Sequence, residues 1–87
     1  MTVQDLIDNG YEDVVVFGSG DKKDYDGCII GVSHDNRAVY SRKLMVQWLM
    51  EQDKISEEEA NEWIDYNTIR SLPYREDSPI VLEFEDA

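Results

Sequence analysis

The chain of 87 residues has few basic side chains, one cysteine, two prolines and no long hydrophobic run. Its 8 lysines and arginines stand against 20 aspartates and glutamates, so the formal net charge is -12. A surface of this sign repels nucleic acid and anionic membranes and attracts basic partners. The most basic stretch, Arg42-Lys43 with Arg37 nearby, is a spot rather than a stripe. We therefore expect no direct binding to nucleic acid.

The single cysteine, Cys28, excludes an internal disulfide and any cysteine-based zinc site. No apolar window reaches the roughly 18 residues that a membrane span requires. The first ten residues carry neither the basic stretch nor the apolar run of a signal peptide. These features predict a soluble protein of one domain, residues 1–87, in the cytoplasm, without contact to a membrane.

Residues that could carry chemistry are present but lack their usual partners. Cys28 and His34 contain the atoms of a thiol-nucleophile site, yet one cysteine and one histidine close in sequence are also what chance supplies. The run Asp24–Gly27 resembles the middle of a calcium loop, but Lys22 and Ser33 occupy positions where the full pattern requires acids. The sequence therefore predicts no enzyme activity, no metal site and no cofactor.

Local patterns predict four strands and three helices. Thr2 and Asp5 form a capping box for a first helix that Gly10 ends, and Ser41 and Ser56 cap the next two helices. The expected strands are 13–17, 28–33, 38–40 and 79–85, and the two longer helices are 42–52 and 57–67. This order predicts an α+β fold, a small antiparallel sheet of three to four strands with helices packed on one face.

Helical periodicity also predicts which side chains enter the core. In the second helix, Leu44, Met45, Trp48 and Leu49 are expected to face inward, with Val46 and Met50 to one side.

In the third helix, Ala60, Trp63 and Ile64 are expected to point inward. Tyr66 and Tyr74 are expected to complete the edge of the core, although tyrosine is also common at interface hot spots.

Acidic side chains repeat at helical spacing in the third helix. Glu58, Glu62 and Asp65 stand at i, i+4 and i+7, so they are expected to line one side, about 5–6 Å apart. Such a ridge approaches the spacing of phosphates and can compete for lysines and arginines that bind nucleic acid. These three residues are the first candidates for contact with a partner, followed by Glu57 and Asp26. The alternative is a solvated acidic face that only confers solubility.

Three runs, Ile30–Tyr40, Trp48–Met50 and Glu62–Tyr74, resemble a set of small uncharacterised proteins from bacteriophages and mobile elements. The likeness extends from about Gly10 to Tyr74. Small acidic phage proteins are often inhibitors of host defence, including anti-CRISPR proteins that occupy the nucleic-acid sites of RNA-guided nucleases. The resemblance thus implies an acidic inhibitor, a DNA mimic, that acts in the cytoplasm of a bacterial host.

Two functions follow as expectations. The first is a non-enzymatic binding protein that blocks a basic surface of a host protein, with an RNA-guided nuclease as one such partner. The alternative is a homodimeric assembly module that joins two copies through the apolar helix surface of Val46 and Met50, with Trp48 beside them.

Overall fold

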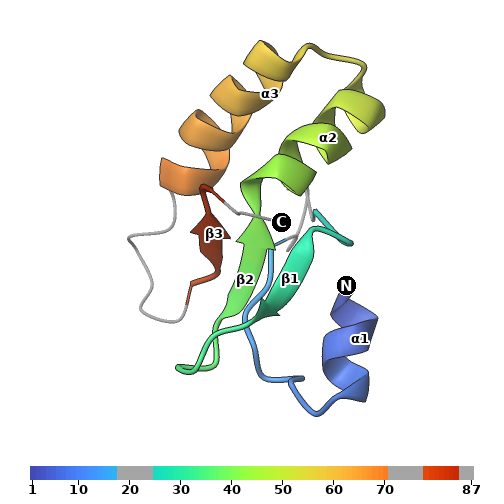
Figure 1. Cartoon of the computed structure of the whole chain (residues 1–87), viewed down its shortest axis with the longest axis vertical. Coiled ribbons are helices and arrows are strands. Elements are labelled where there is room, and N and C mark those ends of the chain that lie inside the picture. Colours follow the sequence, from blue (N-terminus) through green and yellow to red (C-terminus); the bar gives the residue numbers. More distant parts are fainter. Residues whose placement is uncertain (18–24, 71–77, 85–87) are drawn as a thin grey trace.

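A computed structural model describes residues 1–17, 25–70 and 78–84 of the chain. The elements along the sequence are α1 (Val3–Asp8), β1 (Ile29–Val32), β2 (Ala38–Ser41), α2 (Arg42–Asp53), α3 (Glu57–Trp63), the π-helical turn η1 (Ile64–Thr68) and β3 (Ile80–Leu82). Figure 1 shows α2 and α3 side by side beyond the end of β2, with α1 near β1. The predicted α+β class is confirmed, with three strands in the described part of the chain.

The three strands form a mixed sheet in the order β1-β2-β3. Strands β1 and β2 form the expected antiparallel hairpin, in which the N–H of Ser33 donates to the carbonyl of Arg37 at 2.8 Å. Strand β3 instead runs parallel to β2, with Val39 opposite Ile80. A parallel neighbour requires a crossover connection, which α2 and α3 supply here. The expectation of an entirely antiparallel sheet therefore needs this correction.

The predicted strand at residues 13–17 is wrong, because these residues form no strand in the structure. Val14 is buried, and Val16 and Phe17 pack against the core. The backbone N–H of Phe17 donates to the hydroxyl of Tyr40 at 3.1 Å rather than to a neighbouring strand. The β-branched run thus signalled burial, which is a large part of what strand propensity measures, and not sheet pairing.

Side-chain caps set the starts of the three helices, as predicted. The hydroxyl of Thr2 accepts the N–H of Asp5, and the carboxylate of Asp5 accepts the N–H of Thr2 at 2.8 Å. Ser41 Oγ caps α2, and Ser56 Oγ accepts the N–H of Glu59 at 3.2 Å to cap α3. Between these helices Lys54 adopts a left-handed conformation with φ 56°, which ends α2 and lets the chain reverse.

Tyr25 connects the segment before β1 to η1, at the C-terminal end of the helical pair. Its side chain is buried, and its hydroxyl lies 2.8 Å from Oγ1 of Thr68, which is itself buried in η1. The Tyr25 ring also packs against Phe17 and Trp48, with centroid distances of 5.7 and 5.3 Å. Burial raises the pKa of this hydroxyl, and its hydrogen bonds with Thr68 and Trp63 oppose that effect. Tyr25 is therefore a neutral core residue over the physiological pH range.

The core faces of the long helices differ in part from the periodicity argument. Met45, Leu49, Ala60 and Ile64 are fully buried as expected, but Val46, expected to one side, is only 8% exposed.

Trp63, expected inward, is 41% exposed, and Tyr66 is 66% exposed rather than completing the core. Ala60 and Ile64 are one helical turn apart and share the buried face, so Trp63 lies about 60° from Ala60 and about 100° from Ile64, at the border of this face. Tyr74 lies outside the described residues.

We expect Tyr25→Phe to lower the free energy of unfolding by about 1–2 kcal/mol, because it removes the buried hydrogen bond between Tyr25 and Thr68. Tyr66→Phe is the matched control on an exposed tyrosine and should change stability by less than about 0.5 kcal/mol. Urea denaturation followed by circular dichroism measures both. Equal stability of the Tyr25→Phe variant and the parent would contradict the role assigned to this contact.

A pH dependence follows from the cap of α1. Hydrogen bonds from the backbone and the side chain of Thr2 lower the pKa of Asp5. This stabilisation is present above the unfolded-state pKa of about 4 and is lost as the pH falls through the lowered folded-state value. Asp5→Asn should therefore destabilise the protein at pH 7, and the difference should narrow as the pH falls toward 3.

Denaturant titrations at pH 7, 4 and 3 test this dependence. Glu12→Gln, which neutralises one exposed carboxylate outside α1, controls for the loss of charge alone. A destabilisation by Asp5→Asn that stays constant over the whole pH range would show that the charge of Asp5 does not strengthen the cap.

Candidate partner-binding surface

The first turn of α3 carries three glutamates, Glu57, Glu58 and Glu59. Their position agrees with the electrostatics of a helix, because the positive end of the helix dipole stabilises carboxylates there. All three are exposed, as is Glu62 one turn later. Within the described residues, the carboxylates of Glu57, Glu58 and Glu62 form no ion pair. We call the surface of these four glutamates the α3 acidic surface.

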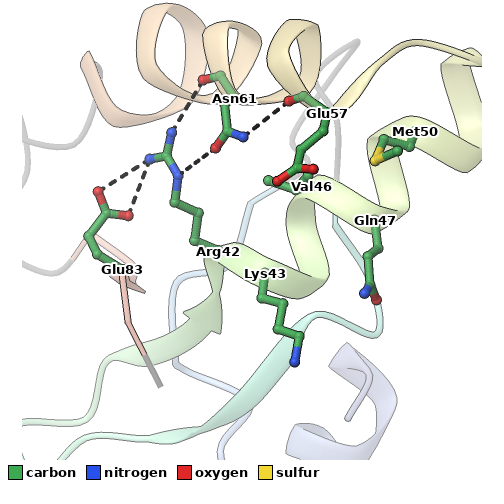
Figure 2. A pocket seen from close by; sticks show the side chains of 8 residues that line it. All are labelled: Arg42, Lys43, Val46, Gln47, Met50, Glu57, Asn61 and Glu83. Carbon is green, nitrogen blue, oxygen red and sulfur yellow. Dashed lines mark hydrogen bonds and ion pairs between the residues drawn. The ribbon is translucent and has the colours of Figure 1, made fainter. Parts of the chain in front are cut away.

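A groove of about 490 Å³ borders this surface where α2 and α3 face each other. Figure 2 shows Glu57 extending from α3 toward α2, with Lys43 and Gln47 along the outer side of α2. The lining side chains are Arg42, Lys43, Val46, Gln47, Met50, Glu57, Asn61 and Glu83. The groove therefore combines an apolar floor with charges of both signs.

Arg42 closes one end of the groove and is held by contacts with three residues. Its Nε donates to Oδ1 of Asn61 at 3.0 Å, and Nη2 donates to the Asn61 carbonyl at 3.3 Å. Nη1 donates to both carboxylate oxygens of Glu83 at 3.2 Å, and Nη2 lies 2.8 Å from Oδ1 of Asp65 (Figure 2 draws all but the last). Burial lowers the pKa of Arg42, but its hydrogen bonds to Asp65 and Glu83 outweigh burial and raise it. Arg42 stays charged and is committed to this network.

The structure separates the five candidate contact residues. Glu58 and Glu62 are exposed one turn apart on α3, as the helical spacing predicts, whereas Glu57 lines the groove that faces α2. Asp65 belongs to η1 and pairs with Arg42, so part of its charge is neutralised within the protein. Asp26 accepts the backbone N–H of Val3 at 2.9 Å and thus lies at the start of α1, away from α3 (Figure 1).

On the other side of α3 lies a second pocket, of about 420 Å³, that the sequence did not predict. Its lining residues are Asp53, Ile55, Glu59, Glu62, Trp63, Tyr66 and Asn67. The pocket was not predicted because Trp63 and Tyr66 were expected to be part of the core. The spacing of Ala60 and Ile64 was the available signal, since a buried face through these two residues leaves Trp63 at its border.

Residues with nucleophilic or metal-binding side chains are not gathered into a site in the described ranges. Cys28 is buried before β1, whereas His34 is exposed in the turn that follows this strand. A strand of four residues between them spans about 13 Å, which is too far for a nucleophile and its base. Over residues 1–17, 25–70 and 78–84, no group of three or more potential ligands could hold a metal ion. The calcium-like run lies partly outside the described residues, since Asp24 is not among them.

Comparisons with protein-family models, with curated proteins and with solved structures find no match to this chain. None of the helices in the described ranges has the length and apolar character needed to cross a membrane. The chemistry of the surface itself is therefore the guide to function.

We expect Arg42→Met to destabilise the fold by about 1–3 kcal/mol, because it removes the charge-assisted hydrogen bonds that Arg42 donates to Asn61 and Glu83. Lys43→Met removes the same charge from the exposed neighbouring residue and should change stability by less than about 0.5 kcal/mol. Thermal and urea denaturation of both variants provide the comparison. Similar losses in the two variants would indicate that net charge alone, and not the network of Arg42, governs stability.

Proposed function

We propose that this protein is a non-enzymatic binding protein whose α3 acidic surface covers a basic, nucleic-acid-binding surface of another protein. The observation that carries the proposal is the set of exposed carboxylates on α3 that form no ion pair within the described residues. Carboxylates neutralised inside the protein could attract a partner only weakly. The carboxylate charges of Glu58 and Glu62 are not neutralised by an internal ion pair, so they can attract lysines or arginines of a partner.

The shape of the surface supports a protein partner. A solvated face that serves only solubility needs charges alone, whereas both sides of α3 are hollowed next to the glutamates. Pockets beside unpaired charges provide the mixture of apolar anchors and polar rim that protein interfaces use. Electrostatic attraction would speed the encounter, and side chains inserted in the pockets would slow dissociation.

The partner class follows from charge and from the resemblance noted above. A basic surface that normally binds nucleic acid offers many lysines and arginines at phosphate spacing. The resemblance to bacteriophage and mobile-element proteins supports a host defence protein, such as an RNA-guided nuclease, as the partner. Inhibition of such a protein places the activity in the cytoplasm of a bacterial host.

The alternative function is a homodimer formed through the apolar side of α2, but this side of the helix is less exposed than expected. Val46 is 8% exposed, and Trp48 packs against the core, so Met50 is the main exposed apolar side chain of that set. A stable dimer usually buries far more apolar area than one methionine offers. We therefore favour the binding function.

The double variant Glu58→Lys, Glu62→Lys should bind the partner at least about tenfold more weakly than the parent at low salt, because two attractions become repulsions. Asp65 is left unchanged, since its reversal would also break the ion pair with Arg42. The matched control is Glu12→Lys, Asp13→Lys, which changes net charge equally at two exposed residues of the segment that follows α1. Figure 1 shows α1 far from α3.

Each protein is immobilised and exposed to host lysate at low and high salt, and the captured proteins are identified by mass spectrometry and confirmed by binding of the purified pair. The expected result is a nucleic-acid-binding protein that the parent and the control retain, and that the α3 variant or high salt releases. The proposed function would be refuted if neither the Glu58→Lys, Glu62→Lys substitutions nor the salt concentration changed binding of the partner.

A further inference from the structure

We propose that the pocket of Trp63 and Tyr66 receives an arginine side chain of the partner protein. This inference depends on the proposed function and assigns one part of the α3 surface a defined chemical role. The pocket lies on the side of α3 away from the Arg42 network, and the two pockets share no lining residue.

Two aromatic side chains give the pocket its apolar surface. Trp63 is 41% exposed and Tyr66 is 66% exposed, and both line the cavity together with the half-buried Ile55. Tryptophan and tyrosine are costly to leave in water, and they are the residue types most enriched at binding hot spots. They lie three residues apart in a helical stretch, so their side chains are neighbours on the surface.

The rim of the pocket determines the charge of its occupant. Asp53, Glu59 and Glu62 line it, and no cationic side chain does so among the described residues. An apolar partner would bury the carboxylate of Glu62, which forms no ion pair within the described residues, without compensation. A second copy of the chain would bring the same carboxylates against them, which disfavours a two-fold contact. A cationic side chain satisfies both the rings and the carboxylates.

Arginine fits this combination better than lysine. Its planar guanidinium stacks on aromatic rings and donates several hydrogen bonds to carboxylates at the ring edge. Lysine has a compact, strongly hydrated charge that makes the ion pair but loses more hydration on stacking. The pocket should therefore prefer arginine at equal net charge, and the part of this preference that comes from stacking should be lost when an aromatic side chain is removed.

The full chain, labelled with 15N, is titrated with nona-arginine and nona-lysine peptides at physiological salt. The protein contains two tryptophans, so the indole N–H of Trp48, which packs against the core, serves as an internal reference for that of Trp63. We expect nona-arginine to bind about two- to fivefold more tightly than nona-lysine and to shift the Trp63 indole resonance more than that of Trp48.

Tyr66→Leu should reduce the preference for arginine toward unity while leaving the affinity for nona-lysine within about twofold. Trp63→Leu should do the same, and Tyr66→Leu decides the matter if the Trp63 variant does not fold. Phe84→Leu is the control, because Phe84 is an 81% exposed aromatic residue outside the pocket. It should leave the preference unchanged.

Different failures have different meanings. An arginine preference that survives Tyr66→Leu, or a shift centred on Trp48, would overturn the arginine pocket. If the Glu58→Lys, Glu62→Lys variant still weakened both peptides in that case, the proposed function would stand without it. If neither peptide bound the parent protein, both the pocket and the acidic binding surface would be refuted.

Discussion

A single guanidinium joins the elements that follow the hairpin. Arg42 begins α2, yet its side chain contacts Asn61 of α3, Asp65 of η1 and Glu83 just after β3. In a chain of net charge -12, one cation placed among carboxylates offsets local repulsion where the second half of the fold converges. The two hydrogen bonds from Arg42 to Asn61 connect the first residue of α2 to α3, and Asn61 in turn donates to the carbonyl of Glu57 one turn earlier in its own helix.

At the end of α3, an acidic residue that is paired within the protein follows acidic residues that are exposed to solvent. From Glu57 to Trp63 the chain is α-helical, and from Ile64 to Thr68 it is π-helical. Asp65 pairs with Arg42 and Thr68 reaches Tyr25 within this wider turn, while Glu58 and Glu62 before it stay exposed to solvent. Insertions of π-helix are frequent at functional sites, and here the insertion lies beside the aromatic pocket. Neighbouring turns of one helical segment therefore hold a carboxylate that is paired within the protein and carboxylates that are exposed to solvent.

Sequence patterns predicted the local features well and the long-range ones less well. The caps at Thr2, Ser41 and Ser56 were predictable because a cap requires only residues three positions apart. The parallel placement of β3 was not, because no local pattern records which strand edge a distant segment joins. The β-branched run at 13–17 and the tryptophan at 63 misled for a common reason: hydrophobicity reports a preference for burial, not the partner that provides it. The acidic residues of α3 were predictable as a set, whereas the pairing of Asp65 and the capping contact of Asp26 required three-dimensional structure.

The parallel pairing of β2 and β3 also constrains how the chain reaches its native state. Val39 and Ile80 are partners in the sheet although the whole helical pair separates them in sequence. Contacts of such separation form slowly, because the loop between them must close first. Until β3 arrives, the hydrogen-bonding groups on the open edge of β2 are exposed, and an unpaired strand edge can join a strand of another molecule. Rapid formation of the α2–α3 hairpin during synthesis would thus protect the nascent protein from self-association.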